Sequence, residues 1–328
     1  MLKKKWKKAL AAAALVMSLG LVAGCGSDNA KESAKTYKVG IVQLVEHRAV
    51  NIANEGFIAG LASKGYKDNV TFDQQNAQAD QSNLVPIAQR FMSNKVDLIC
   101  AISTPVAQTM ASATQDIPIV ATAVTDYEEA KLVADSKHPR GNITGTTDMN
   151  PIREQIDLML RLAPKTKTIG TVYCSSEVNS QKQIAVMKAY AKEKGLAVVE
   201  ATVSNVNDIQ QAARSIVGKV DAVYIPTDNV VASAAPTLIA ITDEANVPVI
   251  CGEANLVKEG ALATLGIDYY NLGFQTGEMA ADILAGRSRP ADMPIQSLKD
   301  LRLTINKENA KKLGIRIPAD LEAQAEMI

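Results

Sequence analysis

The chain is poor in the residues that catalytic sites commonly use. Its 328 residues include two histidines, His47 and His138, and four cysteines. It contains no Gly-x-Ser-x-Gly elbow, no phosphate-binding glycine loop and no clustered metal ligands. The sequence therefore favours a protein that is not an enzyme, and we expect no cofactor and no metal.

Cysteine spacing excludes a disulfide framework. After Cys25 only Cys100, Cys174 and Cys251 remain, an odd number at long intervals without metal-ligand spacing. Each follows an apolar strand-like run, so we expect small buried side chains. A cysteine-dependent enzyme stays open as an alternative, in which Cys100 or Cys174 would need His47 as its base.

Long apolar runs are also scarce. The run from Ala9 to Val22 follows five lysines among the first eight residues and is shorter than the roughly 20 residues that span a bilayer. It ends in Val22-Ala23-Gly24-Cys25, which resembles the bacterial lipobox. We therefore predict a lipoprotein signal peptide at 1–24, lipidation of Cys25 and a flexible tether at 25–36.

Removing the signal peptide leaves a mildly acidic chain. The full sequence has 35 basic and 35 acidic residues, and the signal takes five lysines and no acid, which leaves 30 against 35, or −5. Nucleic-acid-binding proteins need a basic surface, so we expect no nucleic-acid partner. We expect an extracytoplasmic protein, anchored to the cell membrane by lipid.

Strand-like and helix-like segments alternate after residue 37. Strands are expected at 37–44, 70–76, 96–102 and 117–123, and helices at 52–64, 81–94 and 105–113. This alternation predicts an α/β fold with a parallel sheet covered on both faces. Three strand motifs recur at offsets of 130, 124 and 130 residues, beginning with Lys38-Val39-Gly40-Ile41-Val42 and Thr168-Ile169-Gly170-Thr171-Val172. The recurrence indicates two copies of one fold.

Three polar or Gly/Pro-rich segments mark possible crossings between the copies, near 142–151, 265–270 and 287–294. We therefore predict two doubly wound parallel-sheet lobes joined by a three-segment hinge. Lobe 1 comprises 37–146 and 267–288, and lobe 2 comprises 147–266 and 289–328. A hinge between two such lobes makes a cleft.

Polar side chains follow the predicted strands, and open parallel sheets bind ligands just beyond the carboxyl ends of their strands. The predicted ligand-binding residues are His47, Ser103, Thr104, Pro105, Thr125 and Asp126 in lobe 1, Glu177, Asn179, Ser180, Thr227, Asp228, Asn229 and Glu253 in lobe 2, and Asp268 at a crossing. Tyr127, Tyr173 and Tyr269 are candidate pocket aromatics, and His138 is expected on the surface.

The layout of these residues suits a small zwitterion. Ser103 and Thr104 precede a helix that starts at Pro105, so they either cap that helix or help to hold a ligand carboxylate. Asp228 or Asp268 could pair with a ligand ammonium, although Asp228 could equally be a helix N-cap. These alternatives stay open in the sequence.

Several motifs together resemble the ABC-transporter substrate-binding lipoproteins of the tryptophan/tyrosine type, which have the type I periplasmic-binding-protein fold. They are the stretches 97–105, 117–120, 123–126, 142–151, 177–180, 226–229 and 266–273, within a match over about 37–325. The chain departs from the family at Arg48-Ala49-Val50-Asn51, where Pro-Ala-Leu-Asp is preferred. That departure leaves the identity of the ligand open.

The resemblance implies capture of an amino acid, an aromatic one being favoured, and its delivery to an ABC permease with its ATPase subunit. It also implies a monomer that closes about its hinge on the ligand. Binding of a branched-chain amino acid or another small zwitterion, and a sensory module, remain alternative predictions.

Overall fold

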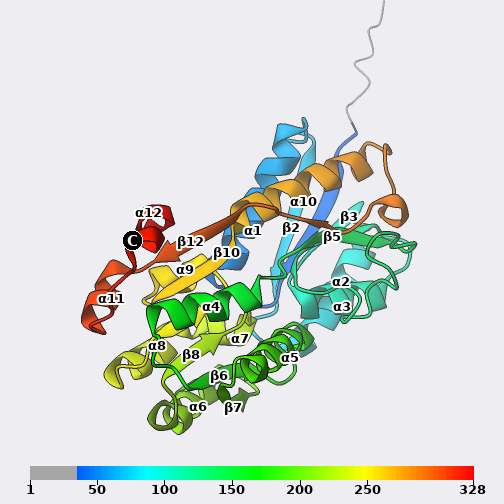
Figure 1. Cartoon of the computed structure of the whole chain (residues 1–328). Coiled ribbons are helices and arrows are strands. Elements are labelled where there is room, and N and C mark those ends of the chain that lie inside the picture. The colour runs from blue at the N-terminus through cyan, green and yellow to red at the C-terminus, as the bar shows by residue number, and fades with distance from the viewer. Residues whose placement is uncertain (1–34) are drawn as a thin grey trace, which may run out of the picture. The chain divides into compact units, whose positions relative to one another are not determined.

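The computed structural model describes residues 35–328, which fold around two β-sheets (Figure 1). The predicted signal peptide 1–24, Cys25 and nearly all of the tether 25–36 lie outside the described residues. Within residues 35–328, no helix is long and apolar enough to cross a bilayer.

The first sheet has six parallel strands in the order β11-β5-β4-β3-β1-β2. Its strands are β1 (Tyr37–Gln43), β2 (Val70–Asn76), β3 (Leu98–Ile102), β4 (Ile119–Val124), β5 (Ile143–Thr147) and β11 (Gln296–Ser297). The helices of this lobe are α1 (Arg48–Ser63), α2 (Leu84–Ser93), α3 (Thr104–Ala113) and α10 (Tyr269–Leu284). Successive strand residues enter two separate apolar clusters, one under α1 and α10 and the other under α2 and α3, because side chains alternate between the faces of a strand.

The second sheet has seven strands in the order β13-β12-β10-β9-β8-β6-β7, and only β12 pairs antiparallel, with β10. Its strands are β6 (Thr168–Cys174), β7 (Ala197–Val203), β8 (Ala222–Ile225), β9 (Val249–Cys251), β10 (Ala263–Ile267), β12 (Leu301–Ile305) and β13 (Glu326–Met327). Its helices are α4 (Ile152–Leu162), α5 (Val178–Glu193), α6 (Ile209–Ile216), α7 (Asn229–Ser233), α8 (Ala235–Glu244), α9 (Ala254–Lys258), α11 (Lys307–Lys312) and α12 (Ala319–Gln324). Apolar clusters again lie on both faces of the sheet.

The two sheets share one strand order. The run β5-β4-β3-β1-β2 of the first sheet corresponds strand for strand to β10-β9-β8-β6-β7 of the second. The predicted α/β fold with two parallel-sheet lobes is therefore confirmed, and the two sheets repeat one strand order, as two copies of one fold would. The carboxyl ends of corresponding strands place equivalent turns at equivalent positions in the two lobes.

Three chain segments connect the lobes. The first follows β5, the second lies between β10 and α10, and the third lies between β11 and β12. The expected assignment of 289–297 to lobe 2 differs from the structure, because β11 pairs with β5 and Thr144 Oγ1 donates to Met293 O at 2.7 Å. The Gly/Pro/Arg-rich segment at 287–294 is a turn that returns the chain from α10 to the same sheet, and the third crossing comes after Ser297.

Helices α1 and α10 pack with their backbones in contact. A Cβ atom at Gly60 would lie 2.1 Å from Phe274 O, and one at Gly277 would lie 2.2 Å from Phe57 O. Glycine alone permits this approach, since any side chain would overlap a carbonyl. The packing fixes the first turns of both helices, which follow His47 and Asp268, on one lobe.

Candidate functional site

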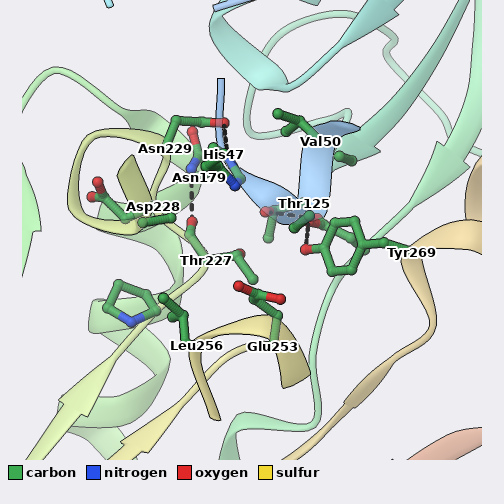
Figure 2. A pocket seen from close by; sticks show the side chains of 15 residues that line it. His47, Val50, Thr125, Asn179, Thr227, Asp228, Asn229, Glu253, Leu256 and Tyr269 are labelled. Carbon is green, nitrogen blue, oxygen red and sulfur yellow. Dashed lines mark hydrogen bonds between the residues drawn. The ribbon is translucent and has the colours of Figure 1, made fainter. Parts of the chain in front are cut away.

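A pocket lies where strand ends of the two sheets face each other (Figure 2). Seven predicted residues line it: His47, Thr125, Asn179, Thr227, Asp228, Asn229 and Glu253. Residues that were not predicted complete its wall: Ala49, Val50, Ala123, Asp148, Pro226, Ala232, Leu256 and, named only as a candidate aromatic, Tyr269. The remaining free volume is about 20 Å³, which is room for about one water molecule.

Seven other predicted residues do not line this pocket. They are Ser103, Thr104, Pro105, Asp126, Glu177, Ser180 and Asp268. Asp268 caps α10 through the Asn271 amide and pairs with Arg302 at 2.9 Å, and Asp126 accepts from two amides of its own turn. Glu177 and Ser180 lie behind the wall and bond to the residues that form it.

Asp228 is fully engaged by its own lobe. Its Oδ1 accepts from Val231 N at 2.8 Å, as the N-cap of α7, and its Oδ2 accepts from Cys174 N at 2.6 Å and Ser180 Oγ at 2.7 Å. Burial raises the pKa of Asp228. These hydrogen bonds agree with the interpretation of Asp228 as a helix N-cap. They give no support to the prediction that Asp228 pairs with a ligand ammonium.

Glu177 lies behind the pocket wall and fixes the positions of the wall residues Asn179 and Asn229 by hydrogen bonds. The buried carboxylate accepts from Asn229 N and Nδ2, Val230 N and Asn179 Nδ2, at 2.6–3.2 Å. Burial, together with the nearby charge of Asp228, raises the pKa of Glu177. Its bonds hold Asn179 so that the amide oxygen Oδ1, which has no partner among the described residues, is a buried acceptor in the pocket wall.

Glu253 is held mainly through one of its two oxygens. Its Oε2 accepts from Asn255 N at 2.8 Å and from Asn255 Nδ2 at 2.9 Å, and the Leu256 amide also interacts with the carboxylate. The side chain is buried, and this burial raises its pKa to about 7. Figure 2 shows it on the wall of the pocket near Thr227 and Tyr269.

Asp148 is a site residue that the sequence reasoning missed. It lies on the first crossing, where Thr125 Oγ1 donates to its Oδ1 at 3.0 Å and the Tyr269 hydroxyl donates to its Oδ2 at 2.6 Å. Burial raises its pKa. The signal was present, because Asp148 follows a strand of the first sheet directly, as the predicted residues do.

The turn between β3 and α3 is strained and has unsatisfied hydroxyl groups. Ser103 has φ 98° and ψ 158°, a conformation that is almost confined to glycine. Its hydroxyl makes no cap, and Ser103 Oγ and Thr104 Oγ1 are both buried without a hydrogen-bond partner in the described part of the chain. Beside Ser103, on the adjoining strand, the pocket residue Ala123 has φ 54°. Such outliers concentrate at ligand sites.

His47 meets the other lobe across the pocket. Its Nε2 lies 3.5 Å from Asn229 Oδ1, and desolvation lowers the pKa of the imidazole to about 4, although the Asn229 contact opposes this. The ring is therefore neutral at physiological pH. His138 lies exposed in its loop, as expected.

The three described cysteines are free and buried, as the sequence suggested. Burial raises the pKa of each thiol, and a nucleophilic cysteine needs the opposite shift. None of them lines the pocket formed by the described residues.

Comparisons with known proteins agree with this geometry. Residues 38–328 match the family described as ABC transporter substrate binding protein. The chain is 42% identical over 312 residues to a tyrosine-binding protein of Clostridioides difficile, covering 92% of this chain and 90% of the relative.

Two solved structures inform the arrangement of the lobes. A Streptococcus pneumonia domain in complex with L-Trp is 38% identical and superposes with a TM-score of 0.87, covering 89% of this chain and 99% of that one. The ligand-free, open structure of a Clostridium difficile substrate-binding protein with adhesive properties is 42% identical at the same coverage, yet its TM-score is 0.68. The lobes of the present structure are therefore arranged more as in the L-Trp complex than as in the open form.

The family match extends over nearly all of residues 35–328, and it agrees with two parallel-sheet lobes that enclose a pocket at their strand ends. Proteins of this kind bind solutes outside the cytoplasm for transport. The chain belongs to the family of ABC transporter substrate-binding proteins.

Proposed function

We propose that this protein captures an aromatic amino acid between its lobes and delivers it to an ABC permease and its ATPase subunit. The observation that carries the proposal is the charge of the pocket. Asp148, Asp228 and Glu253 line it, whereas no lysine or arginine does among the described residues. A pocket that buries carboxylates without cations favours a ligand that brings a positive charge.

We assign the ligand ammonium to Glu253. Both hydrogen bonds from Asn255 reach Oε2 of Glu253, which leaves Oε1 the less engaged oxygen, while both oxygens of Asp148 and of Asp228 accept hydrogen bonds. The buried Asn179 Oδ1 supplies a second acceptor on the same lobe. An ammonium group has three donors, so it can satisfy both oxygen atoms.

We assign the ligand carboxylate to the start of α3, which does not line the pocket in this arrangement of the lobes but lies beside its wall residue Ala123. Helix N-termini favour anions through their free N–H groups and the helix dipole. Here the partnerless hydroxyls of Ser103 and Thr104 add two donors. The ligand would thus join a donor-bearing turn of lobe 1 to acceptors of lobe 2.

Support for an aromatic side chain comes from two sources. The pocket wall includes small or aliphatic residues that offer an apolar surface to an aromatic ring: Ala49, Val50, Ala123, Ala232 and Leu256. Similar proteins are described as tyrosine-binding and as a complex with L-Trp. Opening of the hinge admits the ligand, and closure makes contacts to both lobes at once.

Ligand screening tests this function. The purified mature protein is titrated calorimetrically with L-Tyr, L-Trp, L-Phe, L-Leu and L-Val, and with sugars and nucleosides as controls. We expect an aromatic amino acid to bind, and to stabilise the fold by about 2.7 kcal/mol at a hundredfold excess over its Kd. Binding of a sugar or nucleoside alone would contradict the proposal, and binding of leucine or valine without any aromatic would move it to branched-chain amino acids.

We also propose that Cys25 carries a lipid that anchors the monomeric receptor beside its permease. The signal layout of residues 1–25 supports this. Labelled fatty acid should be incorporated into the protein and lost in Cys25→Ser. Incorporation that survives this substitution would refute the anchor and leave ligand capture unaffected.

A further inference from the structure

Lys182 of α5 reaches across to lobe 1, outside the ligand pocket. Its Nζ lies 3.2 Å from Asp126 Oδ2 and 3.1 Å from Glu129 Oε2, two acids in the turn that follows β4. We propose that Lys182 is a positioning residue for ligand capture, which favours the closed arrangement of the lobes without touching the ligand. The expected effect of Lys182 on ligand affinity rests on the proposed function. The effect of Lys182 on closure of the lobes can be measured without ligand.

The turn of lobe 1 presents Asp126 to this contact. Its Oδ1 accepts from Glu128 N at 3.1 Å and Glu129 N at 3.0 Å, so Oδ2 is left directed at Lys182. Hydrogen bonding to a carboxylate from its own backbone fixes the side chain before the lobes meet. Less side-chain entropy is then lost when the ion pair forms, which is the usual cost of an exposed pair.

No other ion pair of the described residues joins the two lobes in this way. The others lie within one lobe, such as Lys188 with Glu200 in lobe 2, or at a hinge segment, where Arg302 pairs with Asp268. Pairs within a lobe are the same in the open and closed forms. The Lys182 pairs are broken by opening, and only such differential contacts shift the equilibrium between the forms.

The remaining hydrogen bonds between the rims are long and include no ion pair. His47 Nε2 lies 3.5 Å from Asn229 Oδ1, and Gln81 Nε2 lies 3.4 Å from Ser176 Oγ. Lys182 has shorter contacts to two carboxylates, and its side chain is only 32% exposed. Arg48 of lobe 1 also attracts Glu259 of lobe 2, but the two form no ion pair. Lys182 therefore makes the shortest electrostatic contact between the rims, and screening by salt should weaken it.

The test compares Lys182→Gln with Lys188→Gln in the mature protein. Lys188 lies on the same helix, and its carboxylate partner, Glu200, belongs to the same lobe. Small-angle scattering of the ligand-free proteins reports lobe opening at about 20 mM and about 500 mM NaCl. We expect the wild type to expand at high salt, Lys182→Gln to be expanded at both salt concentrations, and Lys188→Gln to behave as the wild type.

Titration with L-Tyr and L-Trp gives the second readout. Two partly exposed ion pairs predict an affinity about two- to tenfold lower in Lys182→Gln at low salt, mainly through faster dissociation. The charge exchange Lys182→Glu with Glu129→Lys should recover part of the loss seen in Lys182→Glu alone.

Equal scattering and equal salt dependence in Lys182→Gln and Lys188→Gln would overturn the inference, as would an exchange that recovers nothing. If neither amino acid binds the wild type, the proposed function has failed. The scattering comparison then still decides whether Lys182 closes the lobes.

Discussion

The turns β3–α3 and β8–α7 occupy equivalent positions in the two lobes but are completed differently. In lobe 2, Asp228 caps its own helix and accepts two further hydrogen bonds. In lobe 1, Ser103 makes no cap, adopts a strained backbone and leaves its hydroxyl, like that of Thr104, without a partner among the described residues. The β8–α7 turn satisfies its own polar groups, whereas the β3–α3 turn needs an external group to do so.

This difference indicates two roles. Asp228 stabilises its own lobe, whereas Ser103 and Thr104 have hydroxyl groups available for a ligand. Unpaired buried polar atoms cost free energy, and a strained backbone costs about 1–3 kcal/mol more. A lobe retains such costs where another interaction offsets them, and the ligand carboxylate is the interaction we propose. The following predictions test this contrast, from the largest effect to the smallest.

Glu253→Gln should lower amino-acid affinity at pH 8 by about 100-fold or more, because it removes the partner of a buried ammonium. Burial raises the pKa of Glu253 to about 7, so ionisation of this group destabilises the ligand-free fold. The variant should therefore be more stable than the wild type at pH 8, by on the order of 1–3 kcal/mol in urea unfolding. Glu308→Gln, which replaces an exposed carboxylate of the same lobe outside the pocket, is the control. Unchanged affinity in Glu253→Gln would remove the assignment.

Acidification should weaken binding in the wild type. The ammonium requires ionised Glu253, so affinity should fall between pH 8 and pH 5, by up to about tenfold per unit below the pKa of about 7. His47, whose pKa is lowered to about 4, stays neutral throughout this range. In Glu253→Gln the profile of the residual affinity should be shallower, although Glu177, whose pKa burial raises to about 8, still titrates behind Asn179 and Asn229. A profile parallel to the wild type would assign the pH dependence to another group.

The same group has the opposite effect on stability. Its pKa in the folded state exceeds its ordinary value of 4.5, so between these pH values the folded state binds more protons than the unfolded one. The contribution of Glu253 to stability therefore rises as pH falls from about 7 towards 4.5. Urea unfolding of the wild type minus that of Glu253→Gln isolates this contribution, and a difference independent of pH would contradict it.

Asp228→Ala should lower the free energy of unfolding by about 2–4 kcal/mol, because Val231 N, Cys174 N and Ser180 Oγ lose their acceptor. Asp228→Asn should be milder, since an amide oxygen can still cap α7 and burial already raises the pKa of Asp228. Calorimetric unfolding measures both. If Asp228→Ala were as stable as the wild type but failed to bind an amino acid, Asp228 and not Glu253 would be the better partner for the ammonium.

Ser103→Ala and Thr104→Val should each weaken binding by about tenfold, since each removes one hydrogen bond to a charged ligand group. Neither should reduce stability, because the removed hydroxyls have no partner within residues 35–328. Ser103→Gly should bind as weakly as Ser103→Ala and be more stable, since glycine adopts φ 98° without strain. Ser112→Ala, on the same helix, is the control. Loss of stability without loss of affinity would mean that these hydroxyls are structural.

Much of the pocket follows from one rule about parallel sheets. Because ligands bind at the carboxyl ends of strands, the sequence pointed to Thr125, Thr227 and Glu253, and the structure brings them together. The same rule could not distinguish Asp228 from Glu253, since both follow strands. Their difference depends on which donors the fold directs at each carboxylate.

The crossing segments show a second limit. A Gly/Pro-rich stretch indicates a turn, but it does not indicate which sheet the chain joins afterwards. Residues 289–297 return to the first sheet through the pairing of β11 with β5, which no local pattern reveals. Asp148 directly follows a strand, as the predicted residues do, but its hydrogen bond with Tyr269, 121 residues away in the sequence, is not visible in any local pattern.

The sequence by itself determined the alternation of strands and helices, the repeated unit and the polar strand ends, because periodicity and turn chemistry are local properties. Only the tertiary structure decided which carboxylate is already satisfied, which hydroxyls lack a partner, and that Lys182 meets Asp126 across the lobes. The physical reason is that hydrogen-bond satisfaction and burial depend on groups that are distant in the chain. These properties are therefore fixed only when the chain has folded and the two lobes are in contact.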